Sequence, residues 1–145
     1  MRMTVKISGL SALRADADAT KAAVRGGLVG ALHEAAYIVE GRAKALVLEP
    51  PKTGRLYKRG KKTTHQASAP GEAPASDTGN LAGSITQDVS AFDLECRVSA
   101  ETPYAEALEY GTTKMEPRPF MRRALTESED LILEAVVDHV KRSIL

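Results

Sequence analysis

The 145-residue sequence has no tryptophan, a single cysteine and few aromatic side chains, four tyrosines and two phenylalanines. One cysteine, Cys96, excludes an internal disulfide framework and a thiolate zinc cluster. So few aromatic rings provide little material for an aromatic-lined small-molecule pocket or for a platform that stacks bases. We therefore expect no cofactor.

The sequence also lacks an excess of either charge and lacks long apolar runs. It carries 20 Lys and Arg against 19 Asp and Glu, a formal net charge of +1. This balance argues against a uniformly basic nucleic-acid binder, although a local basic patch is compatible with it. No apolar run approaches the ~18 residues that a membrane span needs. Residues 1–6 do not have the apolar stretch of a signal peptide. We expect no membrane partner and synthesis in a reducing cytoplasm.

Two long segments predict helices in a single domain over residues 1–145. Residues 13–48 and 118–144 place apolar side chains at helical spacing. Pro50 ends the first helix, and Pro119 suits the first position of the second. Three glycines interrupt the first helix and predict a late start, a bend or a close approach by a neighbour: Gly26, Gly27 and Gly30.

The other segments predict strands and one short helix. Residues 4–10 favour a short strand, and residues 81–100 favour a β-hairpin with its turn near Ser90. Alternation supports the second strand of the hairpin, at Phe92, Leu94, Cys96 and Val98. A helical turn over 104–110 ends at Gly111. The fold class is therefore α+β, with a long N-terminal helix and a C-terminal helix packed on a small antiparallel sheet.

Residues 49–79 differ in composition from the rest of the chain. They hold six basic and three acidic side chains, a net charge of +3, and their only large apolar residues are Leu56 and Tyr57. So little apolar surface predicts a long mobile loop without secondary structure. The loop is either a solvated connection or an arm that contacts DNA or another subunit. The candidate contact residues are Lys52, Arg55, Tyr57, Lys58, Arg59, Lys61 and Lys62.

A second candidate surface is the polar and aromatic turn over residues 101–112. Tyrosine gives a large contact area at a low cost in entropy, so this turn suits a protein interface. The alternative is a connector whose tyrosines pack inward. The candidate interface residues are Tyr104, Glu106, Glu109, Tyr110 and Thr112.

We find no pattern of residues that predicts catalysis or metal binding. The three histidines, His33, His65 and His139, lie on separate elements without metal-ligand spacing. Cys96 fits a small core side chain better than a nucleophile. The acidic residues of the last helix are expected on a solvated face: Glu127, Glu129, Asp130 and Glu134. We therefore predict no catalytic, metal or cofactor-binding residues and no enzyme.

Three groups of motifs together resemble one known family. The first comprises P-K-T-G-R-L-Y at 51–57 and H-Q-A-S-A-P-G-E-A-P at 65–74. The second comprises D-T-G-N-L at 77–81 with Ser84 and Ile85. The third runs from Tyr104 to Thr112, followed by P-R-P-F-M at 117–121 and Ala124-Leu125. In this order they resemble the neck or tail-completion proteins of long-tailed bacteriophages and prophages, also described as tail components or head–tail joining proteins.

The resemblance implies a structural virion protein made in the cytoplasm of a bacterial host. Such a subunit would form a homo-oligomeric ring at the head–tail junction, six-fold in the virion, and would contact other neck, connector or tail-tube proteins. The basic loop would order on assembly, facing either the DNA channel or a neighbouring subunit. Two alternatives remain, a tail terminator that caps the tail tube and a small nucleic-acid-binding protein that uses the basic loop.

Overall fold

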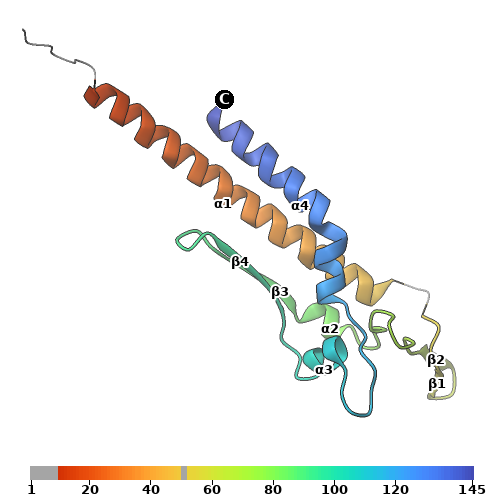
Figure 1. Cartoon of the computed structure of the whole chain (residues 1–145). Coiled ribbons are helices and arrows are strands. Elements are labelled where there is room, and N and C mark those ends of the chain that lie inside the picture. The colour runs from red at the N-terminus through yellow and green to blue at the C-terminus, as the bar shows by residue number, and fades with distance from the viewer. Residues whose placement is uncertain (1–9, 50–51) are drawn as a thin grey trace, which may run out of the picture.

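The computed structural model describes residues 10–49 and 52–145 and has the predicted α+β architecture. Helix α1 (Leu10–Leu48) and helix α4 (Met121–Ile144) lie side by side and antiparallel (Figure 1). The hairpin of β3 (Ile85–Ser90) and β4 (Glu95–Ala100) also lies along α1. The remaining elements gather where α1 ends and α4 begins: β1 (Leu56–Arg59), β2 (Thr63–Gln66), α2 (Asn80–Gly83) and α3 (Ala105–Tyr110).

The two long helices approach closely at the glycines of α1. A Cβ on Gly27 would lie 2.7 Å from Oγ of Ser143 and 2.9 Å from the carbonyl oxygen of His139. A Cβ on Gly30 would lie 2.7 Å from Nδ1 of His139. The imidazole of His139 also lies against α1, with Nε2 2.7 Å from Oε2 of Glu34. Of the three interpretations of the glycines, close approach by a neighbour is the one that the structure shows.

The hydrophobic core lies beside the C-terminal half of α1. Phe120 and Ile85 are its largest fully buried side chains. Residues 14–22 of α1 are all exposed, and α1 extends past the end of α4 (Figure 1). In the residues that the structure describes, no helix is long and apolar enough to cross a membrane. The helix α1 contributes small and branched residues one turn apart to the core: Val39, Ala43, Leu46 and Val47.

The predicted hairpin over 81–100 is shorter than expected. Residues 80–83 form the helix α2, because Gly79 turns the chain in a left-handed conformation (φ +80°) and Leu81 and Ala82 are buried together. Strand β4 begins at Glu95, because Leu94 has a φ of 54° and cannot continue a strand. The strand predicted from alternating apolar residues is therefore wrong at its first two positions, Phe92 and Leu94. Phe92 lies in the turn, with 88% of its surface exposed.

The expectation that residues 49–79 lack secondary structure is wrong. Strands β1 and β2 pair antiparallel, with Leu56 opposite Gln66 and Arg59 opposite Thr63. Gly60 adopts a φ of +66° in the turn between them. We call residues 55–66 the basic hairpin. The mobility of this segment stays a prediction.

Helix α4 begins later than predicted. The sequence favoured a start at residue 118 with Pro119 in the first position, whereas the helix begins at Met121 and Phe120 occupies the N-cap. The strand predicted over 4–10 falls outside the described residues, apart from Leu10, which begins α1.

Candidate functional site

The basic hairpin carries most of the predicted contact residues on its surface. Lys58, Lys61 and Lys62 are exposed, and so are Leu56 and Tyr57. The guanidinium carbon of Arg55 lies 5.7 Å from the centroid of the Tyr57 ring, within range of a cation–π contact. Arg59 is the last residue of β1. The hairpin therefore presents a concentrated positive charge together with two exposed apolar side chains.

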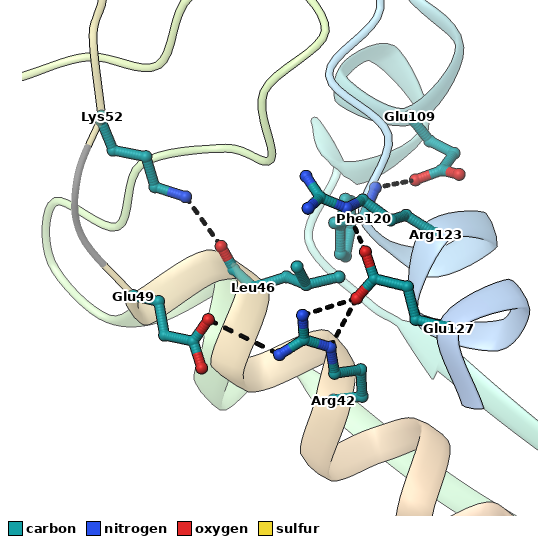
Figure 2. Close-up of polar contacts among 8 residues, drawn as sticks. All are labelled: Arg42, Leu46, Glu49, Lys52, Glu109, Phe120, Arg123 and Glu127. Carbon is teal, nitrogen blue, oxygen red and sulfur yellow. Dashed lines mark hydrogen bonds and ion pairs between the residues drawn. The ribbon is translucent and has the colours of Figure 1, made fainter. Parts of the chain in front are cut away.

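Lys52 is separate from this surface. Its Nζ donates a hydrogen bond of 2.7 Å to the carbonyl oxygen of Leu46, in the last turn of α1 (Figure 2). Burial lowers the pKa of Lys52, and the nearby carboxylate of Glu72 partly opposes that shift. A cation at the C-terminal end of a helix is stabilised by the helix dipole. Lys52 therefore has a structural role at the end of α1.

Glu72 holds the base of the basic hairpin. Its carboxylate accepts hydrogen bonds from the backbone N–H groups of Thr53 (3.0 Å) and Ala69 (2.8 Å), and also from the Thr53 hydroxyl. These hydrogen bonds, the hydroxyl first, lower the pKa of Glu72 to about 2. Sequence reasoning missed this residue, because nothing in a single sequence links a glutamate to a threonine 19 positions earlier.

Next to the Glu72 carboxylate, the backbone at residues 54–55 passes very close to the backbone at residues 67–68. The backbone N–H of Gly54 donates to the carbonyl oxygen of Ala67 at 3.0 Å, and that of Ala67 donates to Arg55 at 3.0 Å. A Cβ on Gly54 would lie 2.5 Å from the carbonyl oxygen of Ser68. Glycine is therefore required here, and the two ends of the basic hairpin are fixed to one another.

The predicted interface turn divides into exposed and buried residues. Tyr104, Glu106, Tyr110 and Thr112 are exposed, as an interface requires. Glu109 is only 5% exposed. Its carboxylate accepts hydrogen bonds from the backbone N–H groups of the N-cap residue Phe120 (2.8 Å) and of the first two residues of α4, Met121 (3.0 Å) and Arg122 (3.0 Å). Glu109 therefore caps α4 and fixes where that helix begins, and it is not available on the surface.

Glu127 joins the two long helices. It accepts hydrogen bonds from Arg42 of α1, at 2.6 Å from Nε, and from Arg123 of α4, also at 2.6 Å (Figure 2). The Arg123 and Arg42 guanidinium groups hold the pKa of Glu127 below its usual range. Arg42 also lies 3.5 Å from Glu49. The four acidic residues expected on a solvated face are all exposed, Glu127, Glu129, Asp130 and Glu134, and Glu127 differs in that it also pairs with two arginines.

The basic hairpin and the interface turn meet at one cavity of about 320 Å³. It is lined by His65 of β2 and by Asp77, whose carboxylate lies 3.7 Å from Nδ1 of His65. Tyr104 and Arg118 line its other side. The cavity therefore brings residues of both candidate segments within one small region of the molecule.

A second cavity is apolar, about 590 Å³, and lies between α1, β4 and α4. Cys96 lines it and is half-buried, and burial raises the pKa of the thiol. A thiol in that state is a poor nucleophile. Within residues 10–49 and 52–145, no group of three or more His, Cys, Asp or Glu side chains is arranged to hold a metal ion.

Comparison of the chain with protein-family models, with curated proteins and with solved structures found no match.

Proposed function

We propose that this chain is a structural subunit of the head–tail junction of a long-tailed bacteriophage or prophage, where a ring of copies joins or completes the tail at the capsid connector. The proposal rests first on the resemblance of the motifs between residues 51 and 125. Its support in the structure is that the first motif group contacts the third, and that the two parts of the third group contact each other. The N–H of Gly71 donates to the carbonyl oxygen of Pro117 (3.0 Å), and that of Arg118 donates to Leu108 (2.7 Å).

The distribution of exposed residues also supports assembly by repetition. The basic hairpin and the exposed tyrosines, Tyr104 and Tyr110, leave chemically distinct surfaces of one copy open to contact with different surfaces of neighbouring copies. A contact between two different surfaces repeats head to tail, and it gives a closed ring when the rotation between copies closes. Such a ring would be six-fold in the virion and would contact connector or tail-tube proteins on its two faces.

The decisive experiment is deletion of the coding sequence in the phage or prophage that carries it. We expect full heads and separate tails of normal length, seen by electron microscopy, and recovery of joined particles when the protein is supplied in trans. Overlong tails would favour the alternative role of tail terminator. Normal infectious particles would contradict both virion roles.

Contact with nucleic acid is the second candidate, favoured by the charge of the basic hairpin. A channel-facing hairpin would bind duplex DNA without sequence preference, and the binding would weaken steeply with salt because each phosphate contact releases a counterion. An electrophoretic mobility assay at rising salt measures this. Tight binding that survives physiological salt would favour an independent nucleic-acid-binding role over a virion role.

A further inference from the structure

The side of α4 that faces away from α1 is an acidic surface with an apolar centre. The buried residues of α4, which face the rest of the fold, are Ala124, Ser128 and Ala135. Helical spacing places Leu133 and Val137 on the opposite side. Leu133 is 64% exposed and Val137 is 39% exposed.

Acidic side chains flank these two apolar residues toward the start of α4, and the exposed Lys141 lies one turn after Val137. Glu129 lies one turn before Leu133, and Asp130 and Glu134 form the neighbouring row. Within the described part of the chain, none of these three carboxylates forms an ion pair, in contrast to Glu127 and Asp138. We call residues 129, 130, 133, 134 and 137 the acidic face. It combines three carboxylates that form no ion pair with a described residue and apolar area exposed to water, and Lys141 marks its C-terminal limit.

The basic hairpin has the opposite charge and a similar amount of apolar surface. Leu56 is 64% exposed and Tyr57 is 50% exposed. Residues 55–66 contain no acidic side chain. Lys58, Lys61 and Lys62 form no ion pair with any residue that the structure describes. The charges and the exposed apolar side chains of the two surfaces therefore match.

The two surfaces of one copy lie on different parts of the molecule. The basic hairpin lies beyond the C-terminal end of α1, whereas the acidic face follows α4 as it runs away from that end (Figure 1). We infer that the basic hairpin of one copy docks on the acidic face of a second copy. The inference rests on the proposed self-assembly and names the contact that would build the ring, a heterologous contact that leaves a free hairpin and a free face at its ends.

A second copy suits the basic hairpin better than DNA does. Phosphate groups would satisfy the lysines, but a sugar–phosphate backbone offers no apolar pocket for Leu56. The acidic face offers both carboxylates and the exposed side chains of Leu133 and Val137. A net charge of only +1 for the whole chain also means that copies do not repel one another, while the separation of its charges attracts them.

The test is a pair of charge reversals that complement one another. The hairpin variant carries Lys58→Glu, Lys61→Glu and Lys62→Glu, so that three glutamates outnumber Arg55 and Arg59. The face variant carries Asp130→Lys and Glu134→Lys, so that two lysines outnumber Glu129. Each variant alone brings like charges together, so its self-association, measured by native mass spectrometry and analytical ultracentrifugation, should weaken by about tenfold or more. In an equimolar mixture every contact is again between opposite charges, and assemblies with alternating variants should form.

Control variants carry charge reversals of the same kind on the exposed N-terminal part of α1. Arg14→Glu with Lys21→Glu, and Asp16→Lys with Asp18→Lys, should associate as the unmodified chain does. Recovery of assembly in the mixture also shows that both variants are folded. Leu133→Ser tests the apolar centre and should weaken association without a change of charge.

Three results would overturn the inference. They are an unmodified chain that stays monomeric at high concentration, a hairpin variant that associates normally, and a mixture that fails to recover assembly. Loss of duplex DNA binding by the hairpin variant, with self-association unchanged, would assign the hairpin to DNA instead. None of these results alters the particle phenotype expected on deletion, so failure of this contact and failure of the virion role are distinguishable.

Discussion

The carboxylate of Glu109 lies 2.8 Å from the backbone nitrogen of Phe120 and accepts its hydrogen bond at the N-terminus of α4 (Figure 2). Glu109 is in the last turn of α3, and Phe120 is a fully buried core residue. One side chain therefore fixes the start of the C-terminal helix relative to the interface turn. The helix dipole favours a negative charge at this position.

Replacement of Glu109 should destabilise the fold more than replacement of the exposed residues of the interface turn. Glu109→Ala leaves three N–H groups at the start of α4 without their acceptor, and we expect a loss of about 2 to 3 kcal/mol in the free energy of unfolding. Chemical denaturation measures the loss. The matched control is Glu106→Ala, an exposed residue of the same helix, with an expected change within about 0.5 kcal/mol. Equal effects of the two changes would contradict a capping role.

Gly26 and Gly27 should respond in opposite directions to alanine. A Cβ on Gly26 meets nothing within 4 Å, so Gly26→Ala should stabilise α1 by about 0.5 to 1 kcal/mol through helix propensity alone. A Cβ on Gly27 would lie 2.9 Å from the backbone oxygen of His139, which a side-chain rotation cannot relieve. Overpacking then outweighs the propensity gain, and we expect a net loss of about 1 kcal/mol.

Thermal unfolding of the two glycine variants, measured side by side, checks this prediction. Because the residues are adjacent in one helix, effects on the unfolded chain largely cancel in the comparison. A gain in stability for Gly27→Ala would mean that α4 does not approach α1 as closely as the structure indicates.

The sequence was sufficient to predict the parts of the fold that repeat a simple pattern. Both long helices carry apolar residues at helical spacing, and the short helix before Gly111 was also predicted. The limits of the β3–β4 hairpin were not predicted. Leu94 fits an alternating pattern by residue type, but its left-handed backbone keeps it out of strand β4, which begins at the next residue. The basic hairpin was missed because its strands carry lysines in place of core residues. A glycine between Leu56-Tyr57 and Thr63-Thr64 was the available signal.

The candidate surfaces were predicted in part for a similar reason. A sequence indicates which residues are polar, but it does not indicate which of them the fold turns inward. Glu106 and Glu109 are equivalent by composition, yet one is exposed and the other caps α4. Lys52 and Lys61 belong to one basic run, yet Lys52 is bound to the end of α1. These differences arise from tertiary contacts between residues that are distant in sequence.

Arg25 should control the order of the β3–β4 hairpin tip. Its guanidinium donates hydrogen bonds to the carbonyl oxygens of Ala91 (2.9 Å) and Phe92 (2.6 Å), and so ties the tip to α1. Arg25→Ala removes this link, and we expect faster hydrogen exchange at the amides of residues 89–96 with a global loss of about 1 kcal/mol. Lys21→Ala, one turn earlier on an exposed part of α1, is the control and should leave exchange unchanged. Unchanged exchange in the Arg25 variant would show that the tip is held by other contacts.

Glu72 should make the stability of the basic hairpin depend on acid pH. The folded-state pKa of Glu72 is about 2, below the value of 4.5 expected in the unfolded chain. The unfolded state therefore takes up a proton first as the pH falls, so the stabilisation is complete above about pH 4.5 and is lost progressively toward about pH 2.

A series of thermal unfolding curves between neutral pH and acid checks this dependence against Glu72→Gln. The glutamine variant keeps a similar shape but has no proton to gain, so its stability should fall less steeply over the same pH range. At neutral pH it should be the less stable of the two, because a neutral amide is a weaker acceptor than a carboxylate for the N–H groups of Thr53 and Ala69. Identical pH profiles for the two proteins would mean that the hydrogen bonds to Glu72 do not hold the base of the basic hairpin in solution.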